Sequence, residues 1–206
     1  MPSRRSVAVA LGLGLAASAL TLSPAPAHAA SSGLVITEVY GAGGNSGADL
    51  NADYVELKNV SSAPISLNGK SLQYRSSGGV AAANGVANLS GTVPAGEHFL
   101  VQTSPEADPD GAELGPADLV VTGVNMSGTA GTVWLANTQS NMTLPTGSIL
   151  NAANVIDLVG FGGTNTSEVA PTAVLSLTTS AKRTNENVDG DNNGADFSVG
   201  AQSPTA

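Results

Sequence analysis

The sequence contains no cysteine, which excludes disulfides and thiolate metal sites. It has two histidines, His28 and His98, so a zinc site built from several imidazoles is excluded as well. Lysine and arginine together number 7 against 16 acidic residues. Proteins bind phosphate backbones through clustered basic residues, so this composition argues against direct binding of nucleic acid.

The first 29 residues have the features of a cleavable signal peptide. Arg4 and Arg5 precede an uncharged apolar run over residues 7–22, and Ala-His-Ala at 27–29 fits a cleavage site. The run is shorter than the ~20 residues that cross a bilayer, so we expect no retained anchor. The sequence therefore predicts a secreted, extracellular protein, exported by the general secretory (Sec) or the twin-arginine route.

Cleavage after Ala29 leaves residues 30–206, in which five basic residues remain against the 16 acidic ones. A chain of this length can bury about 70% of its unfolded surface in a single core. We therefore expect one domain, with its folded core at about residues 34–200 and no membrane span in the mature form.

Short runs rich in valine, isoleucine, threonine and tyrosine alternate along the chain with clusters of glycine, proline, asparagine, aspartate and serine. This spacing is typical of an antiparallel sandwich or barrel, and no long segment keeps a helical period. The sequence therefore predicts an all-β domain. The predicted strands are Leu34–Tyr40, Tyr54–Val60, Ser71–Ser76, His98–Gln102, Gly131–Asn137, Val155–Gly160, Val174–Arg183 and Asp196–Val199.

Alternation of apolar and charged residues is clearest around Val55. Val55 and Leu57 are expected to face the core, and the charged residues Glu56 and Lys58 the opposite side of the sheet. Residues 78–89 and 106–118 are small or acidic and are expected to form long surface loops. Large aromatic side chains are usually buried, so core positions are predicted for Tyr40, Tyr54, Tyr74, Phe99, Trp134, Phe161 and Phe197.

No catalytic motif is complete. Gly69–Ser71 copies the end of a phosphate-binding loop, but the glycine that should begin that loop is absent. His98 is the single histidine of the mature chain, and no activated serine accompanies it, so we interpret it as a surface residue of its strand. Chemistry based on carboxylates alone stays open for Glu38, Asp53 and Glu56, although such acids are more often solvated or hydrogen-bonded structural groups.

The most specific local pattern is the acidic segment that begins at Asp189. Asp189, Asp191 and Asn193 occupy relative positions 1, 3 and 5, glycine follows at 6, and Asp196 comes two residues later. This matches the opening of a calcium loop, in which closely spaced oxygens converge on one cation. The sequence therefore predicts these four residues as candidate calcium ligands.

Two observations keep another interpretation of this segment open. The bidentate glutamate of a helix-flanked calcium loop is missing, because Gly200 stands at relative position 12. Aspartate and asparagine also favour tight turns without metal, and Lys182, Arg183 or turn amides could offset the negative charges. The segment is therefore either a calcium site or a set of ion-paired turns.

Several motifs occur in the order found in the bacterial lamin tail domain family. They are Leu34–Tyr40, the glycine-rich segment 41–47, Asp53–Asn59, Ile65–Gly69, Leu72–Tyr74, Gly91–Gly96, Phe99–Gln102, Gly131–Asn137, Val155–Gly160, and Arg183 followed by Asp189–Phe197. Together they resemble that family over residues 34–200. The resemblance implies an immunoglobulin-like antiparallel β-sandwich. It also implies occurrence as a secreted protein or as an accessory module beside extracellular nucleases, phosphatases and other hydrolases.

Two functions fit these observations. One is a secreted, non-catalytic binding or structural module for an extracellular protein, a glycan or a cell-envelope component, stabilised by calcium. The alternative is a metal-dependent extracellular hydrolase, or an accessory module of a secreted nuclease or phosphatase. Such a hydrolase would use Asp189, Asp191 and Asp196, and Glu38 or Glu56 could assist them. The fold is compatible with both functions, so the arrangement of the carboxylates has to distinguish between them.

Overall fold

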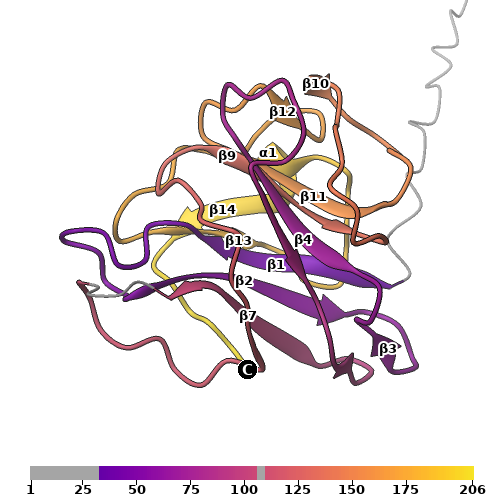
Figure 1. The fold of residues 1–206 in the computed structure, drawn as a ribbon, viewed down its shortest axis with the longest axis horizontal. Helices are drawn as coiled ribbons and strands as arrows, with labels where there is room; N and C mark the ends of the chain where they lie inside the picture. The colour runs from indigo at the N-terminus through magenta and orange to yellow at the C-terminus, as the bar shows by residue number, and fades with distance from the viewer. Residues whose placement is uncertain (1–32, 106–109) are drawn as a thin grey trace, which may run out of the picture.

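The computed structural model describes residues 33–105 and 110–206, so the predicted signal peptide lies outside the described residues. Within these ranges two β-sheets pack face to face, as Figure 1 shows. The strand pairs in both sheets are antiparallel, except for one short parallel pair at an edge. The predicted antiparallel β-sandwich is confirmed.

The first sheet has the strand order β14-β13-β1-β2-β7-β8, and the second has the order β11-β9-β4-β5. The strands of the first sheet are β1 (Leu34–Tyr40), β2 (Ala52–Asn59), β7 (His98–Pro105), β8 (Leu119–Val120), β13 (Ser180–Arg183) and β14 (Phe197–Gly200). The strands of the second are β4 (Ser71–Ser76), β5 (Gly85–Asn88), β9 (Gly131–Ala136) and β11 (Val155–Phe161).

Two small ribbons and one short helix complete the described fold. β3 (Ile65–Ser66) pairs with β6 (Thr92–Val93), and β10 (Gly147–Ser148) pairs with β12 (Thr166–Ser167). The helix α1 covers Asn193–Asp196 and leads directly into β14. Among the described residues, no helix is long and apolar enough to cross a membrane.

Each predicted strand overlaps an observed one, with most boundaries within three residues, and two segments differ more from the prediction. The strand predicted from Val174 begins at Ser180, because residues 176–179 form a turn in which the Ser176 amide donates to the Thr179 hydroxyl. The predicted loop at residues 78–89 contains β5, which pairs with β4. β5 has no apolar run and forms because the edge of β4 offers it a hydrogen-bonding partner.

The core between the sheets follows the alternation of the sequence. Val55 and Leu57 are fully buried there, as predicted, and they pack with Leu72 and Val133 of the opposite sheet. All seven aromatic side chains are buried, which confirms that prediction too. Trp134 points to the other side of the second sheet, where loop residues Leu144 and Ile149 cover it in a smaller apolar cluster.

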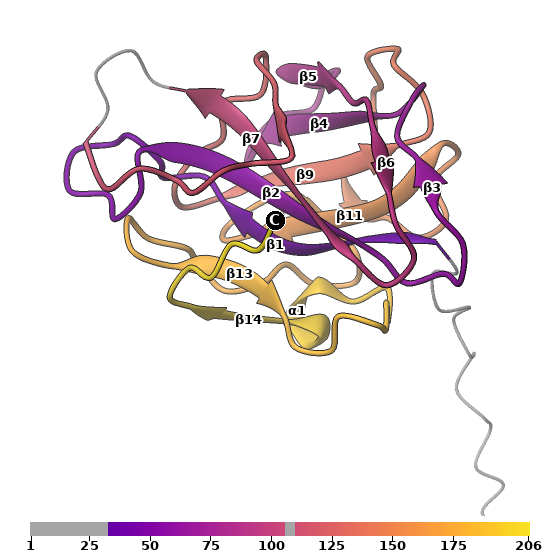
Figure 2. The ribbon, with the colours of Figure 1, turned by 90° about the horizontal axis from the view of Figure 1, so that it is seen from below.

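The outer side of the first sheet carries two buried carboxylates. Of the two alternatives considered for these acids, solvated or hydrogen-bonded structural groups, the second holds, because Glu38 and Glu56 are each only 2% exposed and accept hydrogen bonds. Residues 201–206 cross this face and cover both carboxylates, as the end of the chain over β1 and β2 in Figure 2 shows. Strand alternation alone could not predict this cover, because a segment distant in sequence provides it.

The two sheets meet where β1 lies beside β11. Both strands have a register shift here, between Ile36 and Glu38 in β1 and between Val155 and Asp157 in β11. The Asp157 carboxylate accepts a hydrogen bond from the Ile36 amide at 2.6 Å. A buried amide that has left the strand ladder needs such an acceptor, so this junction places a carboxylate inside the fold.

Candidate cation site at the junction of the two sheets

Arg183 of β13 is the centre of a charged cluster at this junction. Its side chain is fully buried and makes ion pairs with Asp157 at 2.8 Å, Asp189 at 3.3 Å and Asp196 at 3.5 Å. The guanidinium also donates to the carbonyl of Ile36 at 2.9 Å. Three aspartates thus share one arginine, which leaves the cluster with excess negative charge.

Glu168, which follows β12, adds a fourth carboxylate to the cluster. It is 6% exposed, and oxygens of Asp157, Glu168 and Asp189 lie within 4.8 Å of one another. Burial first, and then the charges of three nearby aspartates, raise the pKa of Glu168 to about 10. A buried carboxylate without a cation takes up a proton, and a bound cation would let Glu168 ionise instead.

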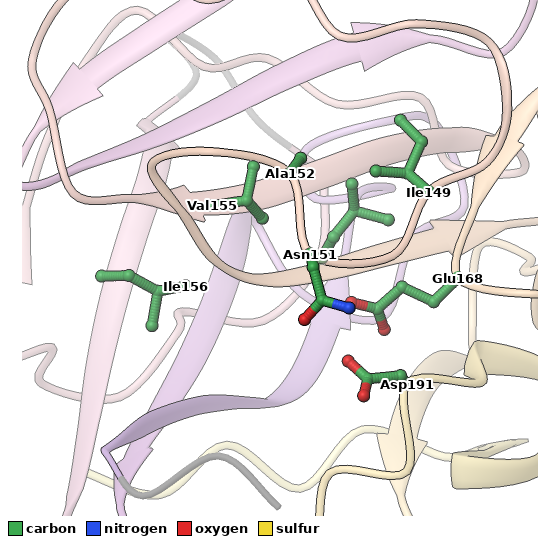
Figure 3. Close-up of a pocket in the computed structure, with 8 residues that line it drawn as sticks. Ile149, Asn151, Ala152, Val155, Ile156, Glu168 and Asp191 are labelled. Atoms are coloured by element: carbon green, nitrogen blue, oxygen red, sulfur yellow. The ribbon is translucent and has the colours of Figure 1, made fainter. Parts of the chain in front are cut away.

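A small pocket of about 70 Å³ lies beside this cluster. Figure 3 shows the carboxylates of Glu168 and Asp191 pointing toward each other, with the Asn151 amide beside them. The rest of the lining is apolar and consists of Ile149, Ala152, Val155, Ile156 and Leu158. The space suits an ion or a few water molecules and is far smaller than typical ligand pockets, which are about 300–1,000 Å³.

The four predicted calcium ligands come together at this junction but take different roles. Asp191 faces the pocket, and Asp189 pairs with Arg183 beside it. The amides of residues 190 and 192 donate to Asp196 at 2.9 and 3.3 Å. The ion-paired turns considered from the sequence are thus present, and the calcium prediction stays a prediction.

Asn193 is occupied by hydrogen bonds on both ends of its side-chain amide. Its Oδ1 accepts from the amides of Gly160 and Glu168 at 2.9 and 3.0 Å. Its Nδ2 donates to the Leu158 carbonyl and to the Glu168 carboxylate at 2.7 and 2.8 Å. Asn193 therefore ties the 189–196 segment to β11 and orients Glu168.

Sequence reasoning missed Asp157, Glu168 and Asn151 as members of this site. They come from three segments that lie far from residue 189 in the chain, so no local spacing joins them. One signal was available for Asp157, because it is the single charged residue in the predicted apolar strand 155–160. A charge in a buried strand requires a partner, and Arg183 is that partner.

The other carboxylates considered from the sequence are separate from this cluster and are not solvated. The Asp53 carboxylate accepts from the amides of Gly43 and Met126, both at 2.9 Å. His98, interpreted as a surface residue of its strand, begins β7 and is half-buried, with its side chain 18% exposed. It lies 2.7 Å from Glu56 and 3.2 Å from Glu186. These acids are structural groups with hydrogen-bond partners.

Comparison with known proteins finds a solved structure with a similar fold. A crystal structure of a DUF4876 family protein from Bacteroides thetaiotaomicron VPI-5482 is similar, with a TM-score of 0.53 and 12% sequence identity. The alignment covers 82% of this chain and 71% of that chain. At this identity the likeness concerns the fold alone. No curated protein matched the chain.

The Lamin Tail Domain family matches residues 27–163 of the chain. This range includes most strands of both sheets, among them β1, β2, β9 and β11. It ends before Glu168, Arg183 and the 189–196 segment, so the family match does not extend to most of the candidate site. With its immunoglobulin-like β-sandwich and a match over more than half of its length, the chain belongs to the lamin tail domain family.

Proposed function

We propose that this protein is an exported, non-catalytic lamin tail domain that acts as an extracellular binding or structural module and holds one calcium ion. Its partner would be a protein, a glycan or a component of the cell envelope. The observation that supports the calcium site is the pair of facing carboxylates, Glu168 and Asp191, beside three aspartates that share one arginine. A cation there would let both carboxylates be ionised side by side without mutual repulsion.

Calcium suits this donor set better than other common cations. The groups facing the space are carboxylate and amide oxygens, and calcium binds 6–8 oxygen ligands in adaptable geometry. Zinc prefers nitrogen and sulfur ligands, and the cluster contains neither histidine nor cysteine. We assign Glu168, Asp189 and Asp191 as ligands, with Asn193 and Asp196 holding the loop that carries them.

The absence of catalysis is part of the proposal and is supported by the shape of the site. A pocket of about 70 Å³ cannot admit a phosphoester or a glycan beside the carboxylates. Glu56, one of the two acids considered as an addition to the hydrolase, groups with His98 and Glu186 and not with the aspartates. A structural ion that stiffens the loop fits this small space better.

Export is proposed from the sequence pattern of residues 1–29. Intact mass measurement of the protein recovered from the culture medium should give a chain that begins at Ala30. Retention of residues 1–29 on the exported protein would contradict cleavage.

Calcium is expected to raise the melting temperature of the protein relative to excess chelator. A ligand that binds the folded state alone stabilises it by about 3 kcal/mol at one hundred times its dissociation constant. Differential scanning calorimetry measures the shift, and Asp110→Asn is a control that removes a carboxylate without touching the cluster. Identical melts of the parent in calcium and in chelator would reject the calcium site.

A further inference from the structure

The segment 201–206 lies across the outer face of the first sheet without forming a strand. The Ser203 amide donates to Glu38 at 3.0 Å, and the Ser203 hydroxyl lies 3.1 Å from the other oxygen of that carboxylate. The Thr205 amide donates to Glu56 at 2.6 Å. Two carboxylates of the sheet therefore bind the main chain of this segment at alternate residues.

The sheet holds these two carboxylates in place independently of the segment. Glu38 and Glu56 are direct partners in the β1–β2 register. Glu38 accepts from the hydroxyls of Tyr54 and Ser180, both at 2.6 Å. Glu56 accepts from the Thr37 hydroxyl at 2.6 Å and lies 2.7 Å from His98. Both acceptors thus form a built site that would persist if the segment moved away.

The segment itself is weakly held. Four of its six residues are exposed, and the other two are only half-buried. The hydrogen bonds that join it to the sheet are those to Glu38 and Glu56 and one of 3.5 Å from the Lys182 ammonium to the Ala201 carbonyl. Segments with few buried apolar contacts open at low free-energy cost, so this one can exchange with a competitor.

We infer that this face is a binding site for an extended peptide, filled in this structure by the protein's own residues 201–206. The ligand would offer two main-chain amides two residues apart, with a serine or threonine at the first position. Pro204, which has no amide hydrogen, stands between the two donors, so the intervening residue needs none. Such a site recognises its ligand through main-chain hydrogen bonds more than through side chains, which suits an extended segment of another polypeptide. It is separate from the proposed calcium site.

The test uses the full chain with Ser203→Pro and Thr205→Pro, which remove both amide donors. The probe is a fluorescein-labelled peptide with the sequence of residues 200–206, followed by fluorescence anisotropy. The resident segment competes in the parent and lowers the apparent affinity, so the double variant should bind the peptide at least about tenfold more tightly. Ala206→Pro, which leaves both donors in place, should bind like the parent.

Adding Glu38→Gln and Glu56→Gln to the double variant should abolish the gain in affinity. A folded double variant that binds no more tightly than the parent would overturn the inference, and so would a gain that survives both glutamine substitutions. Loss of cooperative unfolding in the double variant would also overturn it, because the segment would then belong to the core. Hydrogen exchange of the parent is an independent check, since the Ser203 and Thr205 amides should exchange much faster than the Val55 amide.

Discussion

Arg183→Met is expected to lower the free energy of unfolding by about 3–5 kcal/mol, the usual loss when one partner of a buried ion pair is removed. Arg183 is fully buried, and Asp157, Asp189 and Asp196 all depend on it for compensation. Methionine keeps much of the apolar volume but leaves these carboxylates without a cation. The loss should therefore come from charge, and urea denaturation in the presence of chelator measures it.

Lys182→Met is the matched control for this experiment. It makes the same change of residue charge on the same strand, but the Lys182 ammonium lies at the surface, where it donates a hydrogen bond to the Ala201 carbonyl at 3.5 Å. Exposed charges contribute at most about 1 kcal/mol, so this variant should unfold nearly like the parent. If Arg183→Met were no more destabilising than Lys182→Met, the junction would not depend on its arginine.

Glu168→Gln is expected to stabilise the calcium-free protein at neutral pH and to abolish its response to calcium. The pKa of Glu168 is raised to about 10 by burial and by nearby aspartates, so the folded state prefers the protonated side chain. Glutamine resembles that neutral form and can still accept the hydrogen bond from Asn193. The same change removes a charged ligand of the proposed ion. Glu168→Gln should therefore raise the stability of the protein without calcium and lower it with calcium.

The pH dependence of stability follows from the same shift. A group whose folded-state pKa is raised contributes stability that is fully present below its unfolded value and is lost as pH rises toward the folded value. For Glu168 this window runs from its ordinary value of 4.5 to about 10. In chelator, the Glu168 contribution should fall by about 1 kcal/mol per pH unit across this window.

Thermal melts at about pH 5.5 and about pH 8 compare the parent with Glu168→Gln. Between these two pH values the parent should lose more stability than the variant. At the higher pH, added calcium should make the parent the more stable of the two proteins. Equal pH profiles for the two proteins in chelator would show that Glu168 ionises in the folded state as it does in the unfolded chain. That result would remove the reason for a cation beside it.

Much of the fold could be predicted because local pattern and packing agree in the long strands. Val55 and Leu57 alternate with polar residues and face the core, as a period of two requires. Short strands such as β5 carry no such pattern, because a neighbouring strand edge induces them. The sequence also could not predict that Glu38 and Glu56 are covered, since residues 201–206 come to lie over them only in the folded chain.

The candidate site was predicted in part for a similar reason. Asp189 and Asp191 belong to a local spacing of acids that is typical of calcium loops, and both lie at the junction of the sheets. Asp157 lies in β11 and Glu168 directly after β12, and only the tertiary structure brings them to the same place. Sites assembled from several segments cannot be found from spacing within one of them.

A crystal structure of the protein grown with saturating calcium tests the proposed site most directly. We predict one ion between Glu168 and Asp191, with oxygen ligands at about 2.3–2.6 Å and Asp189 in or beside the ligand shell. Only water in this space, or carboxylates of Glu168 and Asp191 turned away from each other, would contradict the proposed calcium site.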